Sequence, residues 1–180
     1  MCGIAGLMSR DGAAPAQATV EAMGVALAHR GPDGIGHYGV GDVAMIHRRL
    51  AVIDLETGDQ PLYEPGGAAL IANAEVYNYL ELRDGMGGVA FATHSDCEPP
   101  LHVYRRHGVA FAGHLRGTYS IVVLDAKTPD RLVVARQCWI MTWMANWMFS
   151  LPVAGNTRTR RYSDCPPPCI AMLTDLPLVQ

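Results

Sequence analysis

Residues 1–7 read MCGIAGL, with a cysteine at position 2 ahead of a short apolar run. If Met1 is removed, Cys2 carries a thiol and a free α-amino group on the same residue. The amine has a pKa of about 7.7–8.0 and the thiol one of about 8.5, so the amine can accept the thiol proton. The alternative is a cysteine that merely begins a buried strand, and these seven residues do not decide between the two.

Length and composition narrow the class of protein. A chain of 180 residues predicts one domain with a substantial core. A net charge of −3 and a pI near 6.1 give no reason to expect a nucleic acid or an anionic membrane as partner. Five cysteines without a regular spacing disfavour a disulfide scaffold and favour a reducing cytoplasm. No basic stretch followed by an apolar one is present, so no signal peptide is expected.

Hydrophobic patterning predicts most of the secondary structure. Strands are expected at residues 3–8, 36–39, 43–53, 68–74, 89–93, 118–125 and 131–136. Helices are expected at residues 16–29, 77–83, 101–107 and 109–115, the first because Val20, Met23 and Leu27 recur at helical spacing. Strands follow strands along the chain and helices group apart, which predicts antiparallel sheets covered by helices rather than a βαβ series.

Three polar positions are candidates for chemistry. The guanidinium of Arg49 offers a planar fork that suits a carboxylate. The side chain of Asn73 and the backbone N–H of Ala74 could point at one spot, as the donors of an oxyanion hole do. Asp96, at a strand-to-helix turn, could receive an ammonium group. Taken singly, each has a plainer interpretation: Arg49 as a surface charge, Asn73 as a turn residue and Asp96 as a helix N-cap.

Seven motifs in order resemble one family. They are MCGIAG (1–6), HRGPDG (29–34), HRRLAVIDL (47–55), GDQPL (58–62), NAEVYNY (73–79), SDCE (95–98) and LRG (115–117). From residue 1 to about residue 136 the chain resembles the glutaminase domain of glutamine-hydrolysing asparagine synthetases, a class II glutamine amidotransferase. The resemblance implies an N-terminal-nucleophile hydrolase of the α+β class. Its fold is a four-layer αββα sandwich, in which two antiparallel sheets stack between helices.

The resemblance also implies catalytic roles. Cys2 is similar to the nucleophile of the family, with its own α-amine as the base. The Asn73 side chain and the Ala74 N–H are similar to the oxyanion hole, and residues 30–34 resemble an architectural loop over the nucleophile. The implied reaction is hydrolysis of the glutamine side-chain amide to glutamate and ammonia through a thioester.

A second set of residues is implied to bind the substrate. Arg49 resembles the clamp on the α-carboxylate of L-glutamine, while Glu75 and Asp96 resemble the ligands of its α-ammonium. Backbone carbonyls around Leu50 and Val52 are implied to help. The glutaminase step needs no cofactor and no metal; ATP and magnesium would belong to a synthetase domain, which could act in trans as a partner.

The chain departs from the family pattern in two places. Position 74 is usually glycine, and Ala74 would be strained by about 1–2 kcal/mol if the site requires a positive φ. After Arg136 the resemblance stops. We therefore expect residues 1–136 to form an amidotransferase domain that is incomplete at its C-terminal end. Residues 137–180 are expected to form a divergent tail foreign to the fold, as in a truncated or frame-shifted product.

Other functions stay open at this point. Ala74 and the divergent tail allow an inactive amidotransferase remnant or a binding module. The mostly apolar run Cys138–Gly155 is barely long enough to span a bilayer and contains Thr142, Asn146 and Pro152, which disfavours a membrane-tethered enzyme. Cys165 and Cys169 flank three prolines but lack further ligands nearby, so no metal site is expected there.

Overall fold

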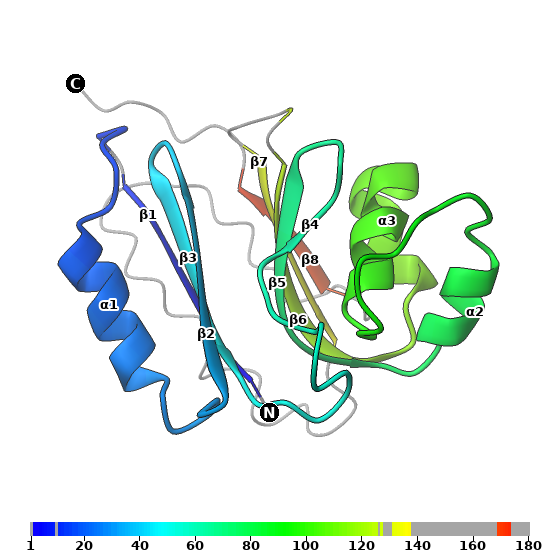
Figure 1. Ribbon diagram of the computed structural model, residues 1–180. Coiled ribbons are helices and arrows are strands. Elements are labelled where there is room, and N and C mark those ends of the chain that lie inside the picture. The colour runs from blue at the N-terminus through cyan, green and yellow to red at the C-terminus, as the bar shows by residue number, and fades with distance from the viewer. Residues whose placement is uncertain (1, 10, 126, 128–130, 138–168, 174–180) are drawn as a thin grey trace.

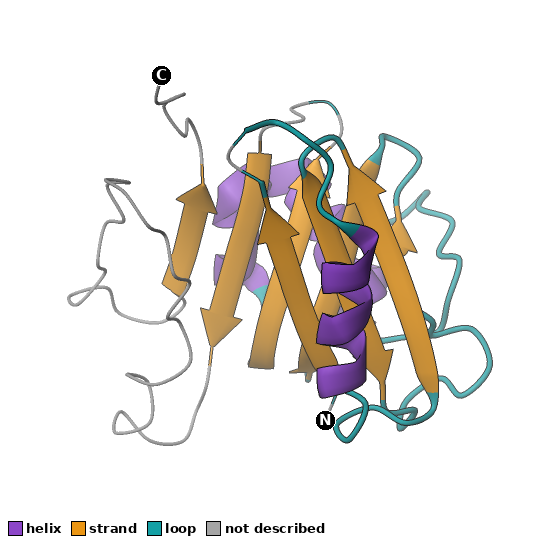
Figure 2. Cartoon of the chain, turned by 90° about the vertical axis from the view of Figure 1, so that its left-hand side faces the viewer, coloured by secondary structure: helices purple, strands orange, loops and turns teal. Residues whose placement is uncertain are grey.

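Four layers make up the protein, as seen in Figure 1. The computed structural model describes residues 2–9, 11–125, 127, 131–137 and 169–173. Helix α1 (Gln17–Ala26) covers one sheet, and helices α2 (Tyr79–Asp84) and α3 (Glu98–His107) cover the other. Figure 2 shows α1 lying across the outer face of its sheet. The α+β class and the αββα layering expected from the resemblance are therefore confirmed.

The first sheet has three antiparallel strands in the order β1-β3-β2, which are β1 (Gly3–Met8), β3 (Val43–Arg49) and β2 (Gly34–Val40). In register, Gly3 of β1 lies opposite Arg48, and Gly34 of β2 lies opposite Arg49. The start of the chain and the loop before β2 therefore meet at the end of the central strand.

The second sheet is antiparallel, in the order β4-β5-β6-β7-β8. Its strands are β4 (Leu62–Tyr63), β5 (Ala68–Val76), β6 (Gly117–Asp125), β7 (Arg131–Gln137) and β8 (Cys169–Leu173). The short helix η1 (Gly108–His114) joins α3 to β6. Strand β8 pairs along β7, so part of the stretch expected to be a foreign tail lies in the sheet.

Side-chain alternation along the strands builds three buried layers. In β3, Ala44 and Ile46 face α1, whereas Val43 and Met45 pack between the two sheets. In β5, Ala69 and Ile71 share that space between the sheets, while the alternate residues face α3. Continuing each alternation brings Arg49 of β3 and Asn73 of β5 to the space between the sheets.

The predicted end of one strand and the predicted existence of another were wrong, for a common reason. The strand expected to reach residue 53 ends at Arg49, because the N–H of Leu50 turns to the Cys2 sulfur and that of Ala51 to a carboxylate oxygen of Asp33. The strand expected at residues 89–93 does not form. There the N–H groups of Ala92 and Thr93 donate to the Glu98 carboxylate instead of to a neighbouring strand.

The other expected elements form with shifted bounds. The helices expected at 16–29 and 109–115 are α1 and the 3₁₀ helix η1. The apolar run Cys138–Gly155, considered above as a membrane span, lies outside the described residues. Within the part of the chain that the structure describes, no helix is long and apolar enough to cross a membrane.

His47 makes the stability of this core depend on pH. Its side chain in β3 is buried, and burial lowers its pKa from 6.5 to about 4, with the backbone at Ala72 acting in the opposite direction and Arg49 in the same one. The unfolded chain therefore binds a proton before the folded protein does. The contribution of neutral His47 to the free energy of unfolding is fully present above about pH 6.5. It is lost as the pH falls towards about 4, by an amount on the order of 3 kcal/mol.

We expect His47→Gln to flatten this pH dependence, as measured by chemical denaturation between about pH 7 and about pH 5. The matched control is Met45→Leu in the same strand, which changes buried packing without removing a titrating group. That control should shift stability equally at every pH. A wild-type slope that persists in His47→Gln would contradict the assignment.

Candidate active site

The Cys2 thiol is held at the end of strand β3. Its sulfur accepts a hydrogen bond from the Leu50 N–H (3.4 Å) and can donate to the Leu50 carbonyl (3.7 Å). The carbonyl of Cys2 accepts from Nε of Arg30 (3.2 Å). Cys2 is half-buried and is a free thiol. The Cys2 sulfur therefore lies against backbone groups at the end of a strand instead of inside the apolar core.

The loop at residues 30–34 lies against the same strand end. The N–H of Asp33 donates to the Arg49 carbonyl (3.0 Å), and the Asp33 carboxylate accepts from the Ala51 N–H (2.8 Å). A side chain at Gly31 would collide with the Arg48 carbonyl, because its Cβ would lie 2.3 Å from that oxygen. These contacts are those of the architectural loop that the resemblance implies.

Arg49 is not a surface charge, because only 7% of the residue is exposed. Its guanidinium donates to the Asp59 carboxylate (2.8 Å), to the Leu55 carbonyl (3.4 Å) and to the Asp54 carbonyl. Asp59 itself is open to solvent, with 78% of its side chain exposed. The buried Arg49 guanidinium, one residue from the Leu50 backbone that contacts the Cys2 sulfur, thus already binds one carboxylate.

Strand β5 presents backbone N–H groups along its edge facing away from β6. The Ala72 N–H donates to the Gln60 side chain (2.6 Å), and the Val76 N–H donates to the Asp96 carboxylate (2.8 Å). Alternate residues of a strand point their N–H groups to the same edge, so the N–H of Ala74 lies between these two. Strand β4 pairs with β5 only at Ala69 and Leu70, so β4 does not pair with residues 72–76 of β5.

Ala74 is not strained. Among the described non-glycine residues, only Asp54 has a positive φ, so Ala74 keeps ordinary strand dihedral angles. Asn73 lies inside β5 opposite Ser120, and therefore is not a turn residue. Both oxyanion-hole candidates thus lie on a regular strand, and the glycine that is usual at position 74 is not required by this backbone.

Asp96 does not cap helix α3, since the N-cap residue is Cys97. The Asp96 carboxylate is 4% exposed and accepts from the Val76 N–H at the end of β5. Burial raises the pKa of Asp96, and the nearby charge of Glu75 adds to the rise, against the Val76 hydrogen bond. Among the residues that the structure describes, no cation pairs with the Asp96 carboxylate, and a buried carboxylate in that state favours the arrival of one, as the binding of an ammonium group requires.

Some of the predicted site residues lie near Cys2 and are buried, whereas others are exposed. Cys2 contacts Leu50 directly, and its charge is among the causes that raise the pKa of the Cys97 thiol, after burial and Asp96. Cys2 and Asp96 therefore lie within electrostatic range of the same buried group. Val52 is 71% exposed and the Glu75 side chain is exposed too, so neither is enclosed.

Two further features bear on ligands. Within the described ranges, no cluster of three His, Cys, Asp or Glu residues could hold a metal ion. A cavity of about 350 Å³ is lined by Tyr77, Leu115, Arg116, Gly117 and Gln137, and none of the predicted site residues lines it.

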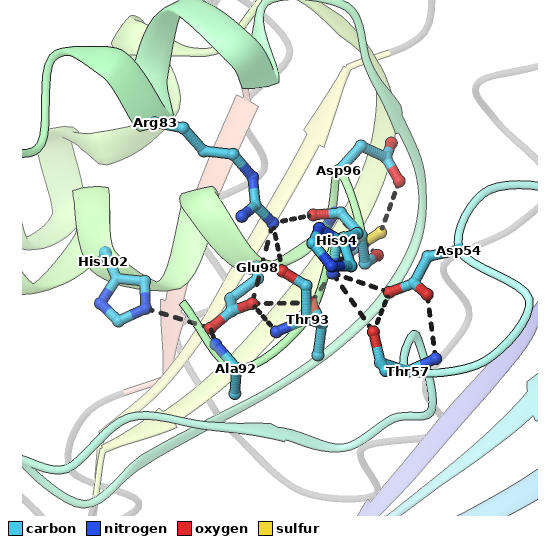
Figure 3. Close-up of polar contacts among 11 residues, drawn as sticks. Asp54, Thr57, Arg83, Ala92, Thr93, His94, Asp96, Glu98 and His102 are labelled. Carbon is cyan, nitrogen blue, oxygen red and sulfur yellow. Dashed lines mark hydrogen bonds and ion pairs between the residues drawn. The ribbon is translucent and has the colours of Figure 1, made fainter. Parts of the chain in front are cut away.

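Sequence reasoning missed the polar network that holds the Asp96 loop in place (Figure 3). The Glu98 carboxylate, 2% exposed, accepts the N–H groups of Ala92 and Thr93 and the Thr93 hydroxyl, all at 2.7 Å. Arg83 donates to the carbonyls of Thr93 (2.8 Å) and Ser95 (2.9 Å). Glu98 belongs to the quoted SDCE motif, so a carboxylate two residues after Asp96 was the signal that could have indicated it.

Comparisons with known proteins agree with this geometry. A family model described as a glutamine amidotransferase domain matches residues 1–139. The asparagine synthetase [glutamine-hydrolyzing] of Sandersonia aurantiaca is 41% identical over 140 residues, which cover 76% of this chain and 26% of that protein. Asparagine synthetase [glutamine-hydrolyzing] 1 of Arabidopsis thaliana is 36% identical over 149 residues, covering 82% of this chain and 26% of the relative. The chain thus spans about a quarter of the length of these relatives.

Among solved structures, the glutamine phosphoribosylpyrophosphate amidotransferase of B. subtilis, complexed with ADP and GMP, has the same fold. The match has a TM-score of 0.57 at 22% sequence identity and covers 76% of this chain and 37% of that chain.

We expect the two described free thiols to differ in reactivity. Cys97 is fully buried and burial raises its pKa well above the ordinary value, so it holds almost no thiolate, whereas Cys2 is only half-buried. Iodoacetamide at neutral pH should label Cys2 more than about tenfold faster than Cys97, as read by peptide mass spectrometry. In a Cys2→Ser chain the fast peptide signal should vanish, and equal rates at the two cysteines would contradict the assignment.

Proposed function

The chain belongs to the glutamine amidotransferase domain family, and on that premise we propose that it hydrolyses the side-chain amide of L-glutamine to glutamate and ammonia. The observation that carries the proposal is the Cys2 sulfur held against the Leu50 backbone, one residue from the buried guanidinium of Arg49. A nucleophile and a carboxylate-binding group so placed fit a substrate that is both an amide and an amino acid.

The reaction uses groups of this chain alone. The Cys2 sulfur attacks the amide carbon, and the oxyanion that forms is stabilised by the Asn73 side chain and the Ala74 N–H. With Met1 removed, the α-amine of Cys2 takes the thiol proton and returns it to the departing ammonia. The C–N bond breaks and a γ-glutamyl thioester remains, which water cleaves to glutamate and the free thiol.

Substrate selection rests on both charges of the amino acid. Arg49 would bind the α-carboxylate, and Asp96 with Glu75 would bind the α-ammonium, helped by the carbonyls of Leu50 and Val52. An analogue that lacks the ammonium would leave the buried Asp96 carboxylate without a cation, which is costly, and one that lacks the carboxylate would leave Arg49 to its contact with Asp59. The buried positions of Arg49 and Asp96 support this assignment.

The ammonia would serve amide synthesis. The relatives named above are glutamine-hydrolysing asparagine synthetases, so we propose the glutaminase part of an asparagine synthase, working with a synthetase domain that uses ATP and magnesium. A free thiol nucleophile suits a reducing cytoplasm. The inactive-remnant alternative rested partly on strain at Ala74, and the ordinary dihedral angles there remove that support.

The activity is tested by the release of glutamate from glutamine. We expect Cys2→Ala to abolish it, and Asn73→Ala to lower kcat by about 10²–10³, because one oxyanion donor is lost. Asp11→Asn, at an exposed turn outside the site, is the control that should keep the wild-type rate. Undiminished activity in Cys2→Ala would remove the proposal.

Asp59 is expected to compete with the substrate carboxylate for Arg49. Its own carboxylate is exposed and occupies one N–H of the fork. An ion pair with an exposed partner is worth about 0.2–1 kcal/mol, so Asp59→Asn should lower the KM for glutamine by about 1.4- to fivefold. Steady-state kinetics against wild type measures this, with Asp11→Asn as the exposed control. A raised KM would show that Asp59 orients Arg49 instead.

A further inference from the structure

Two loops carry the two ends of the proposed substrate site. The loop at residues 50–58 follows Arg49, and the loop at residues 91–97 carries Asp96. They are about 40 residues apart in the sequence, yet the side chains of Asp54 and Thr57 join them in Figure 3, both by accepting the His94 N–H. One oxygen of its carboxylate accepts the His94 N–H (2.8 Å), two residues before Asp96.

The same carboxylate also organises its own loop. Asp54 accepts the Thr57 N–H (2.9 Å) and the Thr57 hydroxyl (2.5 Å), and that hydroxyl in turn accepts the His94 N–H (3.3 Å). Three donors therefore converge on one carboxylate. Burial alone would raise the pKa of Asp54, but the hydrogen bonds from Thr57 and His94 outweigh it, so the pKa is lowered and the group stays charged.

The backbone of Asp54 holds the other end of the site. Its carbonyl accepts a hydrogen bond from the Arg49 guanidinium. Asp54 also has φ +57°, a conformation that asparagine and aspartate adopt more readily than other non-glycine residues. This conformation lets one residue direct its carbonyl towards Arg49 and its side chain towards His94.

Arg83 and Glu98 hold the loop at residues 91–97 from the side of the helices, so the remaining contact, that of His94 with Asp54, acts on Asp96. Glu98 binds the N–H groups of Ala92 and Thr93, and Arg83 binds the carbonyls of Thr93 and Ser95. His94 lies between these anchors, and its N–H is accepted from the other loop. A displacement at His94 would be transmitted to Asp96 within two residues.

We propose that Asp54 is a positioning residue that sets the separation between the Arg49 guanidinium and the Asp96 carboxylate, and thereby selects substrates carrying both an α-carboxylate and an α-ammonium. The inference rests on the proposed function and names its specificity determinant. Asp54 touches no reacting atom, since the nucleophile precedes β1 and the oxyanion donors lie on β5. Its loss acts on the binding of the amino-acid end and leaves the chemistry at the amide intact.

The test compares three substrates in wild type, Asp54→Asn and Thr57→Val. Glutamine carries both charges, 4-carbamoylbutanoate lacks the ammonium, and 4-aminobutanamide lacks the carboxylate. Asparagine keeps the shape and tolerates the positive φ, but its amide offers one acceptor oxygen in place of two. Valine at position 57 removes the bridging hydroxyl. Asp11→Asn, at an exposed aspartate that accepts the Ala13 N–H, is the matched control.

For Asp54→Asn we expect the KM for glutamine to rise about tenfold with kcat changed less than about twofold, because the substrate is misplaced and the reacting groups are not. The preference for glutamine over each single-charge analogue should fall by a similar factor. Thr57→Val should change both quantities in the same direction, and Asp11→Asn neither. A purely structural role would instead lower kcat for all three substrates alike.

An unchanged KM and an unchanged preference in Asp54→Asn would overturn the inference, even if wild type is an active glutaminase. If wild type releases no glutamate, the proposed function fails, and binding still decides the inference. Calorimetric titration of glutamine into Cys2→Ala and into Cys2→Ala with Asp54→Asn should then show an affinity about tenfold weaker in the double variant. Equal affinity, or no binding to Cys2→Ala, would overturn it.

Discussion

The structure depends on a hydrogen bond between a backbone amide and a sulfur atom, from the N–H of Leu50 to Cys2. To make it, the chain leaves strand β3 at Arg49. Beyond this strand end, the Ala51 N–H donates to the Asp33 carboxylate. The loop that follows bends back, and the carbonyls of Asp54 and Leu55 accept hydrogen bonds from Arg49. The end of a central strand is thus where the thiol, the guanidinium and the loop before β2 meet.

The second sheet contributes to the candidate site in the same manner: backbone N–H groups that would otherwise bond to a neighbouring strand donate to side chains. On the open edge of β5, Gln60 and Asp96 accept the N–H groups of Ala72 and Val76. Asp96 therefore has two functions in this arrangement. It satisfies a buried amide at the end of a strand, and it holds a negative charge beside the Cys97 thiol within range of Cys2.

Local patterns predicted the elements well: alternation in β5 and β6 and the spacing of Val20, Met23 and Leu27 indicated antiparallel sheets covered by helices. The αββα arrangement itself was implied by the family resemblance that the ordered motifs carry. What failed was decided by side chains far along the chain. Nothing in VAFAT at residues 89–93 indicates that Glu98 will take its amides, and nothing in residues 50–53 reports that Cys2 and Asp33 will do so.

Leaving part of β5 uncovered has a consequence for self-association. An exposed strand edge with several free amides invites another chain to add to the sheet. Here the amides on both sides of Ala74 are already accepted by Gln60 and Asp96, so an incoming strand would meet at most one of the three. The edge can remain accessible to a small molecule and still offer a poor template for the growth of the sheet by another protein chain.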